Sequence, residues 1–355
     1  MSKRHYIIPI FISHQGCPHQ CVFCNQDRIA KVVQEEVTER DVRETVDEYL
    51  KTIDHKNSTV EISFFGGTFT AINVNKQKEL LAVAKEYKEK GYIDKIRMST
   101  RPDAINKYIL DYLKDYKVDI IELGVQSLDD EVLRLSGRGH SAEEVEKASK
   151  LIKEYGITLG HQIMPGLPGD TFEKDIETVK KSIKMKPDIC RIYPSLVIKD
   201  TPMADMYERG QYKPYSLEEA VDISKELYKL YKDANVNIIR IGLQNTDEIT
   251  DPSVKGSEVV AGPYHPAFRQ LVEANLWYDD ILKRIKEMNT KVKRVKIIIN
   301  PKDVNNVVGH KRENIKKLKD VYELDLIIEQ DEKMKEGKFK LEILEKYPEF
   351  LDEKE

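Results

Sequence analysis

The sequence predicts an α/β protein whose larger part is built on a parallel sheet. The first observation is a regular alternation of short apolar runs with amphipathic segments between residues 6 and 194. Such runs are typical of buried parallel strands, and the segments between them of helices. The second observation is that polar or glycine-containing turns follow successive runs. Functional groups gather where parallel strands end, so these turns form the candidate site.

Six strand-helix units are expected. The predicted strands cover residues 6–12, 60–65, 96–100, 120–126, 158–164 and 189–194. The predicted helices begin near Thr38, which has a capping-box partner in Asp41, and then cover residues 75–90, 106–116, 141–155 and 171–184. Right-handed crossovers would place all strands in one sheet. An open doubly wound sheet and a full or partial barrel both satisfy this pattern.

Length and composition set further limits. The chain has 355 residues, which allows one large and one small domain, and we expect a core at 1–250, a connecting segment at 251–285 and a small α/β domain at 286–355. Lys and Arg number 58 and Asp and Glu 62, so the global charge neither favours nor excludes nucleic acid. No apolar run approaches the roughly 18 residues of a membrane span, and we expect a cytoplasmic protein with no membrane partner.

Three cysteines follow the first apolar run in the spacing C-x3-C-x2-C. They are Cys17, Cys21 and Cys24. A four-iron, four-sulfur (4Fe-4S) cluster normally takes four cysteine ligands, so a loop with three leaves one iron open to a ligand that is not protein. The fourth cysteine, Cys190, lies in an apolar run and is expected to be a small buried side chain.

Two other interpretations of these cysteines remain. Structural zinc needs four ligands, and His14 or His19 could supply the fourth. A disulfide framework is less favoured, because four cysteines in so long a chain without a signal peptide are not typical of a secreted protein.

The cysteine spacing, with Phe23 before the last cysteine, resembles the radical S-adenosylmethionine (SAM) superfamily. The resemblance implies a 4Fe-4S cluster whose open iron is chelated by the amino and carboxylate groups of SAM. It also implies that one electron, from an external donor, cleaves SAM to a 5'-deoxyadenosyl radical. The fold implied is a partial (β/α)6 barrel similar to part of a TIM barrel.

Later motifs resemble one branch of that superfamily, the oxygen-independent coproporphyrinogen oxidases and their relatives. Gly66-Gly67-Thr68 stands where the family holds the amino group of SAM, and residues 122–128 with 137–140 match the same branch. The match implies that Gln126 and Arg138 bind the cofactor, with the arginine on its carboxylate.

Ser99 and Gln162 depart from that branch, which has acidic residues at both positions. Both side chains keep the ability to form hydrogen bonds, so both remain candidates for cofactor binding. The stretches 99–103, 138–140, 193–201 and 207–215 instead resemble the radical domain of the Elongator catalytic subunit, over residues 5 to about 250. No Arg-x-x-Gly-x-Gly/Ala run, which an acetyltransferase domain would need, follows residue 250.

The C-terminal segment resembles a KH domain. A strand is expected at 292–299, a short helix at 301–307, a second helix after residue 309 and a strand at 325–328. The loop between the helices would contact the RNA backbone. The candidate RNA-binding residues are Gly309, Lys311, Arg312 and Lys316. They belong to a wider basic set that we expect to face few acids: Lys291, Lys293, Arg294, Lys296, Lys302, Lys317 and Lys319. A solvated lysine-rich face is the alternative.

The sequence therefore predicts a radical SAM enzyme with a 4Fe-4S cluster that abstracts hydrogen from a tRNA nucleoside. The predicted partners are SAM, tRNA and an external one-electron donor, and no catalytic side chain is assigned. The alternatives are a radical enzyme for a small molecule, as in coproporphyrinogen oxidation, and a non-catalytic RNA-binding protein with a structural metal.

Overall fold

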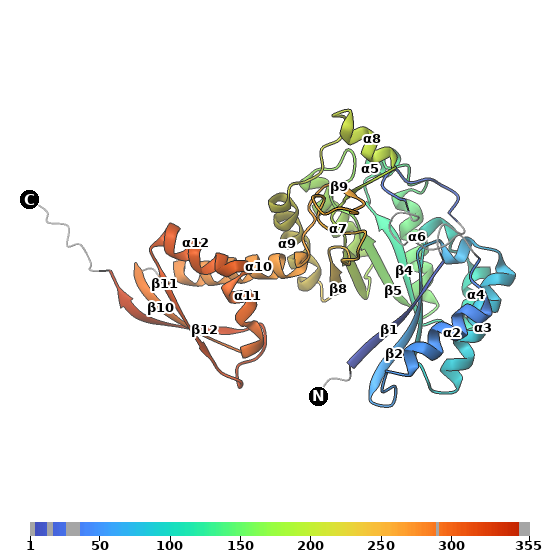
Figure 1. Ribbon diagram of the computed structural model, residues 1–355, viewed down its shortest axis with the longest axis horizontal. Helices are drawn as coiled ribbons and strands as arrows, with labels where there is room; N and C mark the ends of the chain where they lie inside the picture. The colour runs from blue at the N-terminus through green and yellow to red at the C-terminus, as the bar shows by residue number, and fades with distance from the viewer. Residues whose placement is uncertain (1–3, 13–16, 26–35, 289–290, 348–355) are drawn as a thin grey trace, which may run out of the picture. The chain divides into compact units, whose positions relative to one another are not determined.

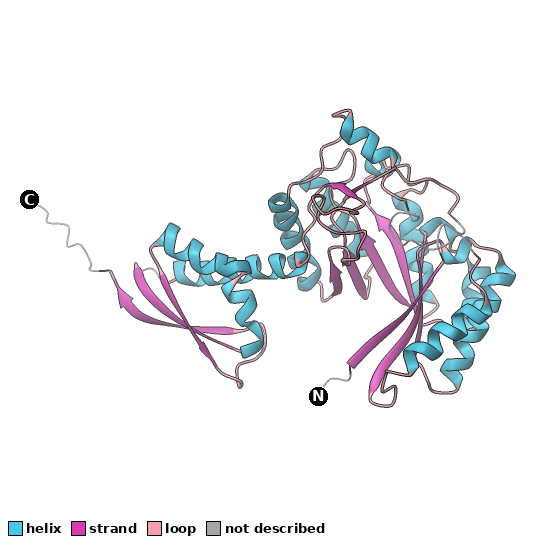
Figure 2. Ribbon diagram, viewed as in Figure 1, coloured by secondary structure: helices cyan, strands magenta, loops and turns pink. Residues whose placement is uncertain are grey.

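The computed structural model of the chain describes residues 4–12, 17–25, 36–288 and 291–347. The chain divides into two compact units, residues Met1–Pro266 and Ala267–Glu355. Figures 1 and 2 show a large parallel sheet flanked by helices in the first unit and a small sheet with helices in the second. No helix among the described residues is long and apolar enough to cross a membrane.

The first unit is a half-barrel, which confirms the predicted fold class. Its sheet has seven strands in the order β1-β2-β3-β4-β5-β6-β8, and each pair of neighbours is parallel. The strands are β1 (Arg4–Phe11), β2 (Ser58–Phe65), β3 (Lys95–Thr100), β4 (Ile120–Gln126), β5 (Thr158–Ile163), β6 (Ile189–Ile192) and β8 (Asn237–Ile241). The carboxyl ends of these strands therefore meet at one rim.

Helices pack on the outer face of this sheet. On β1, Ile8 and Ile10 are buried while Ile7 and Phe11 are exposed, so the strand turns one apolar row toward the helices and another toward the barrel interior. The helices are α2 (Glu39–Leu50), α3 (Val74–Glu89), α4 (Lys107–Asp115), α5 (Asp130–Leu135), α6 (Ala142–Glu154), α7 (Phe172–Lys184) and α9 (Leu217–Asp233). At least one of these helices lies between each two successive strands of the sheet, and all but α5 and α9 were predicted from the sequence.

Local signals explain where these helices begin. Thr38 and Asp41 form the predicted capping box at the start of α2, in which each side chain bonds the other's backbone N–H. Ser216 and Glu219 form the same motif at α9, where the sequence analysis placed no helix. The capping box could have identified α9, and with it the seventh strand that follows.

An insertion between β6 and α9 covers the cysteine loop. It contains β7 (Val197–Ile198) and α8 (Pro202–Glu208), and β7 pairs antiparallel with β9 (Val259–Ala261) from far along the chain. Val197, Met203 and Tyr212 form a small core there, and Val22 and Phe23 of the cysteine loop pack against it. The insertion therefore holds one side of the loop in place.

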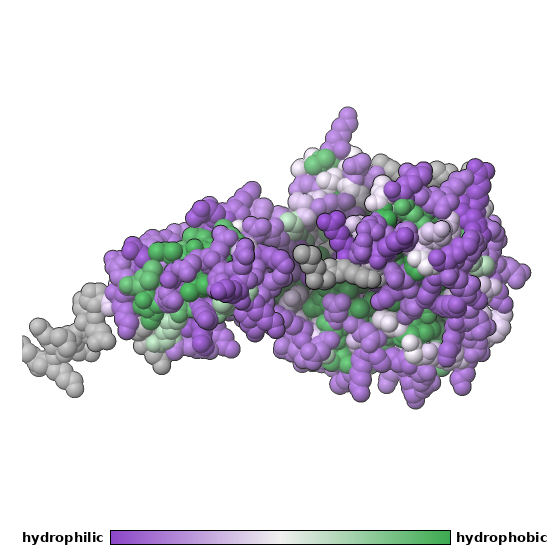
Figure 3. Space-filling view, turned by 90° about the horizontal axis from the view of Figure 1, so that it is seen from below, coloured by the Kyte–Doolittle hydropathy of each residue, from purple (hydrophilic) through white to green (hydrophobic). Residues whose placement is uncertain are grey.

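The second unit has a three-stranded sheet. The central strand, β10 (Val292–Ile299), runs parallel to β11 (Asp325–Gln330) and antiparallel to β12 (Phe339–Lys346). Three helices accompany it: α10 (Phe268–Lys286), α11 (Val304–Val308) and α12 (Glu313–Tyr322). The sequence placed most of α10 in a connecting segment, but Ile281 of α10 packs in one core with Val295 and Leu318. Hydrophilic residues cover most of the face of this unit drawn in Figure 3.

Two aspartates lie at the start of α7, the half-buried Asp170 in the turn before the helix and the buried Asp175 in its first turn. Burial raises the pKa of Asp170, and burial together with the Asp170 carboxylate raises the pKa of Asp175 well above its ordinary value. The hydroxyl of Tyr215 donates to Asp175 at 2.9 Å. The folded protein therefore holds a proton here at a pH where the unfolded chain has lost it.

This pair predicts a pH-dependent stability. A raised carboxyl pKa means that stability falls as pH rises from about 4 through the raised pKa, because the folded state resists ionisation. Asp175→Asn should therefore raise the unfolding temperature at pH 8 and change it little at pH 4. For a domain of this size, a stability change of 1 kcal/mol shifts the unfolding temperature by about 2–4 °C. Thermal unfolding across that range measures the effect. Exposed Asp320→Asn is the control, and a lower unfolding temperature for Asp175→Asn at pH 8 would contradict this account.

Candidate functional site

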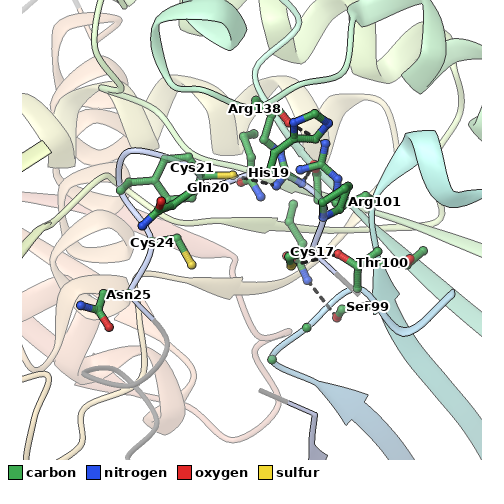
Figure 4. A pocket seen from close by; sticks show the side chains of 18 of the residues that line it. Cys17, His19, Gln20, Cys21, Cys24, Asn25, Ser99, Thr100, Arg101 and Arg138 are labelled. Atoms are coloured by element: carbon green, nitrogen blue, oxygen red, sulfur yellow. Dashed lines mark hydrogen bonds between the residues drawn. The ribbon is translucent and has the colours of Figure 1, made fainter. Parts of the chain in front are cut away.

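A cavity of about 530 Å³ lies where β2, β3, β4 and β5 end, under the cysteine loop. Figure 4 shows side chains from the loop and from the strand ends facing this space. Every predicted cofactor residue lines it: Cys17, Phe23, Cys21, Cys24, Gly66, Gly67, Thr68, Ser99, Gln126, Arg138 and Gln162. Residues separated by almost 150 positions in the chain are therefore brought to one place.

Backbone hydrogen bonds fix the cysteine loop on two sides. The N–H of Val22 donates to the carbonyl of Ser136 at 3.0 Å, and the N–H of Met203 donates to the carbonyl of Val22 at 2.9 Å. Among the cysteines, Cys21 is buried, Cys24 is half-buried and Cys17 is exposed. The loop thus presents its thiols to the cavity from a fixed backbone.

Arg138 links this loop to the sheet. Its Nη1 donates to Cys21 Sγ at 3.4 Å, and its Nη2 donates to the carbonyl of Gly124 at 2.5 Å. A Cβ on Gly124 would lie 2.6 Å from Arg138 Nη2. A side chain at position 124 would therefore displace the guanidinium from its place across β4.

The glycine-rich turn after β2 approaches the first cysteine. Thr68 Oγ1 and Cys17 Sγ are 3.2 Å apart and share a hydrogen bond. Gly66 has φ of 99°, a conformation that L side chains rarely adopt, and the backbone of Ile12 lies 3.5 Å from the place of its missing Cβ. The turn therefore brings bare backbone and one hydroxyl to the cavity.

Ser99 and Gln162 lie side by side at the base of the cavity. Gln162 Nε2 donates to Ser99 Oγ at 3.3 Å and to Glu122 Oε2 at 3.1 Å. Glu122 is 1% exposed and is paired with Arg97 and Arg191. A buried charged network thus supports the polar pair from below.

Several buried polar atoms around the cavity have no hydrogen-bond partner among the described residues. They are Arg138 Nε, Gln126 Oε1 and Arg101 Nη1. Gln126 also has φ of 66°, a strained conformation for a residue other than glycine. Unpaired buried polar atoms cost free energy, and strain of this kind clusters at ligand sites, so this arrangement fits a polar ligand that supplies the missing partners.

The three cysteines of the loop are a set of ligands that suits a 4Fe-4S cluster. No three Cys, His, Asp or Glu side chains of the described residues converge to hold one ion. The thiolates of a 4Fe-4S cluster bind three different irons and need not converge. Cys190 is 1% exposed within β6, away from the cavity, so it is not a fourth ligand. His14, one candidate for a fourth zinc ligand, lies outside the described residues, and the ring of His19 lies against Gly139.

Sequence reasoning missed several residues of the site. Arg101 lines the cavity, and it donates to the carboxylate of Asp103 at 2.9 Å and to the carbonyl of Arg138 at 2.5 Å. Gly124 was noted only as part of a motif. A buried His140 lies behind Arg138, where burial and the nearby arginines lower its pKa to about 3 and keep it neutral. A buried arginine gives no signal in one sequence, because its burial depends on the fold.

The predicted RNA-binding residues lie in the second unit. Gly309, Lys311 and Arg312 form the turn between α11 and α12, and Lys316 follows in α12. The expectation that the wider basic set faces few acids is wrong. Most of that set forms ion pairs with acids of the same unit: Lys293 and Arg294 with Glu345, Lys296 with Glu329 and Glu342, Lys302 with Glu336, Lys317 with Glu313, and Lys319 with Asp325. Neighbouring strands and turns place acids beside these bases, which the linear sequence does not reveal.

The cavity predicts which cysteines hold iron. Cys17→Ala, Cys21→Ala and Cys24→Ala should each lose most of the roughly four irons per chain expected of the reconstituted protein, because the cluster would keep only two protein ligands. Cys190→Ala should keep the iron and lose some thermal stability, since that side chain is buried in the core. Iron content and visible absorbance measure the effect. Full iron loading of Cys21→Ala would refute the assignment.

Comparison with known proteins agrees with this site. Residues 11–181 match the Radical SAM superfamily and residues 187–278 match the Radical_SAM C-terminal domain. An uncharacterized protein of Methanocaldococcus jannaschii is 31% identical over 220 residues, which are 59% of this chain and 67% of that protein. A tRNA uridine(34) acetyltransferase of Methanocaldococcus infernus is 30% identical over 255 residues, 61% of this chain and 48% of that protein.

The chain thus spans about half the length of the curated acetyltransferases that it matches. A solved structure of archaeal Methanocaldococcus infernus Elp3 with an N-terminal deletion has a TM-score of 0.61 and 24% identity, covering 80% of this chain and 64% of that one. That likeness confirms the fold. The matched families and the three-cysteine cavity lead to one conclusion: this chain belongs to the radical SAM superfamily, whose members use a 4Fe-4S cluster and SAM.

Proposed function

We propose that this radical SAM enzyme modifies a nucleoside of tRNA. One observation supports the radical chemistry. Three cysteine thiols line the same cavity as buried polar groups whose atoms include some with no hydrogen-bond partner among the described residues. Relatives named tRNA uridine(34) acetyltransferase support tRNA as the substrate. Because the chain spans about half of those relatives, its reaction on tRNA need not be theirs.

Each cavity residue has a proposed role. Cys17, Cys21 and Cys24 would hold three irons and leave the fourth for the amino and carboxylate groups of SAM. The unpaired Arg138 Nε is a charge-assisted donor suited to the carboxylate, and Gln126 Oε1 is an acceptor. The remaining contacts would come from Phe23, Gly66, Gly67, Thr68, Ser99 and Gln162.

When bound, the cluster and SAM would supply a 5'-deoxyadenosyl radical, given one electron from an external donor. The protein's own task is to keep water from the reacting atoms. Below the cavity, side chains occupy part of the barrel interior: Arg191 lies 5.5 Å from the centroid of the Phe65 ring and pairs with Glu122. A substrate would therefore enter from the rim side. We also propose a cytoplasmic location, which would suit a tRNA substrate.

The second unit is proposed to bind the RNA backbone, as a KH domain does. Gly309 has φ of 76°, and its missing Cβ would lie 3.0 Å from the buried Asn314. Asn314 in turn donates to the carbonyls of Ala274 and Val307. The turn is thus held by its own unit, with Arg312 at the start of α12 in a left-handed conformation.

The exposed cations of this turn differ from the paired bases around them. Lys311, Arg312 and Lys316 are exposed and form no ion pair with a described residue. They stand at the first turn of α12, where backbone N–H groups also favour an anion. This supports contact with phosphate. A KH loop normally begins and ends with glycine, and here Arg312 stands in the place of the second glycine.

The radical reaction is tested by 5'-deoxyadenosine formation. The anaerobically reconstituted and reduced protein should cleave SAM, and bulk tRNA should change the rate, because a substrate that accepts the radical alters its fate. Cys21→Ala should form none. A rate that responds to coproporphyrinogen and not to tRNA would favour the small-molecule alternative, and a cluster-loaded protein that forms no product under any condition would contradict an enzymatic role.

The RNA-binding turn is tested by salt dependence. The variant K311A/R312A/K316A should weaken tRNA binding and lower the slope of log affinity against log salt by about 2, since each phosphate contact contributes roughly 0.7–0.9. The matched control K302A/K317A removes two lysines that are already paired and should change the slope little. Equal slopes for both variants would show that tRNA does not contact this turn.

A further inference from the structure

Glu122 lies at the junction of the buried charge network and the cofactor cavity. Its neighbours in register are Ser99 on β3 and Gly160 on β5, and Gln162 follows two residues later on β5. A Cβ on Gly160 would lie 2.7 Å from Glu122 Cγ. The bare backbone of Gly160 therefore gives Glu122 the space to reach both the arginines and Gln162.

The Glu122 carboxylate is fully occupied by donors. Oε1 accepts from Arg97 Nη1 at 2.7 Å and from Arg191 Nη2 at 3.0 Å, and Oε2 accepts from Arg191 Nε at 2.6 Å and from Gln162 Nε2 at 3.1 Å. Burial alone would raise the pKa of Glu122, but the arginines outweigh it and lower the pKa. The group is therefore ionised and acts only as an acceptor.

An ionised partner fixes which way the Gln162 amide points. The carbonyl oxygen cannot face a carboxylate, so Nε2 must, and its second hydrogen is directed to Ser99 Oγ at 3.3 Å. Both N–H groups of the amide are then used within the protein. What remains for a ligand in the cavity is the acceptor Oε1 of Gln162 and the hydroxyl hydrogen of Ser99.

We propose that Glu122 is a positioning residue that makes Gln162 an acceptor and Ser99 a donor for the two adjacent ribose hydroxyls of SAM. A vicinal diol matches this pair, since one hydroxyl can donate to Gln162 while its neighbour accepts from Ser99. The inference rests on the assignment of this cavity to SAM in the proposed function. It concerns the cofactor alone and is independent of the RNA substrate.

The test compares ligands with and without the ribose hydroxyls. Calorimetric titration of the anaerobically reconstituted full chain would use SAM and its 2'-deoxy and 3'-deoxy analogues. The wild-type protein should bind at least one deoxy analogue roughly tenfold more weakly than SAM, because a buried partner is left unpaired. In Glu122→Gln the Gln162 amide is free to turn, so SAM should bind roughly tenfold more weakly and the preference over the deoxy analogue should shrink.

Two further variants separate positioning from a general loss of structure. The exchange E122Q/Q162E restores an acceptor at position 162 facing an amide donor at position 122, and should recover most of the preference. Glu61→Gln is the matched control, because Glu61 is 0% exposed and pairs with Arg97 at 3.0 Å but does not contact Gln162. It should lower thermal stability and leave the ligand preference intact.

Each outcome decides the matter. The inference is overturned if Glu122→Gln retains the wild-type preference, if Glu61→Gln loses as much of it, or if the wild-type protein binds both deoxy analogues as tightly as SAM. Should Glu122→Gln not fold, Gln162→Met carries the test and must lose the preference while the protein remains folded. A cluster-loaded wild-type protein that fails to bind SAM would instead refute the cofactor site itself.

Discussion

The guanidinium of Arg138 is the contact on which the site depends, because it joins the cysteine loop to the sheet. One nitrogen reaches Cys21 and another the carbonyl of Gly124. That crossing requires the absence of a side chain at position 124. The loop has few apolar residues of its own, so its position comes from this bridge, from the backbone hydrogen bonds of Val22 and from the packing of Phe23 against the insertion after β6. The same contacts therefore hold the cysteine loop and shape the cavity beneath it.

Beneath the cavity, charge replaces the apolar layers that usually fill a barrel. Glu61 and Glu122 alternate with Arg97 and Arg191, and all four are nine-tenths buried or more. Burying such charges is costly, and hydrophobic side chains of similar volume would often be as stable. A role for the ionic network explains why it is kept: its charges decide which polar side chains above it donate and which accept hydrogen bonds. It gives Gln162 and Ser99 fixed hydrogen-bonding directions, which an apolar layer would not provide.

Features that depend on residues close together in the chain could be predicted from the sequence, and features that depend on contacts between distant residues could not. The strands and helices of the first six units, the cysteines and the turns at the strand ends could be predicted because periodicity and spacing are local. Arg101 and Glu122 could not, because their burial depends on strands far apart in the chain. The basic set of the second unit was misjudged for the same reason: Lys296 meets Glu342 only across a sheet. β8 was missed although the capping box of the preceding helix was visible.

The central claim is that three cysteines leave one iron open for SAM. Electron paramagnetic resonance of the anaerobically reconstituted, reduced protein tests it directly, with SAM carrying ¹⁷O in its carboxylate or ¹⁵N in its amino group. The account predicts that SAM shifts the cluster signal and that the labels couple to it, because both groups would bind the open iron. A cluster signal that is unchanged by saturating SAM, with no coupling to either label, would contradict the account.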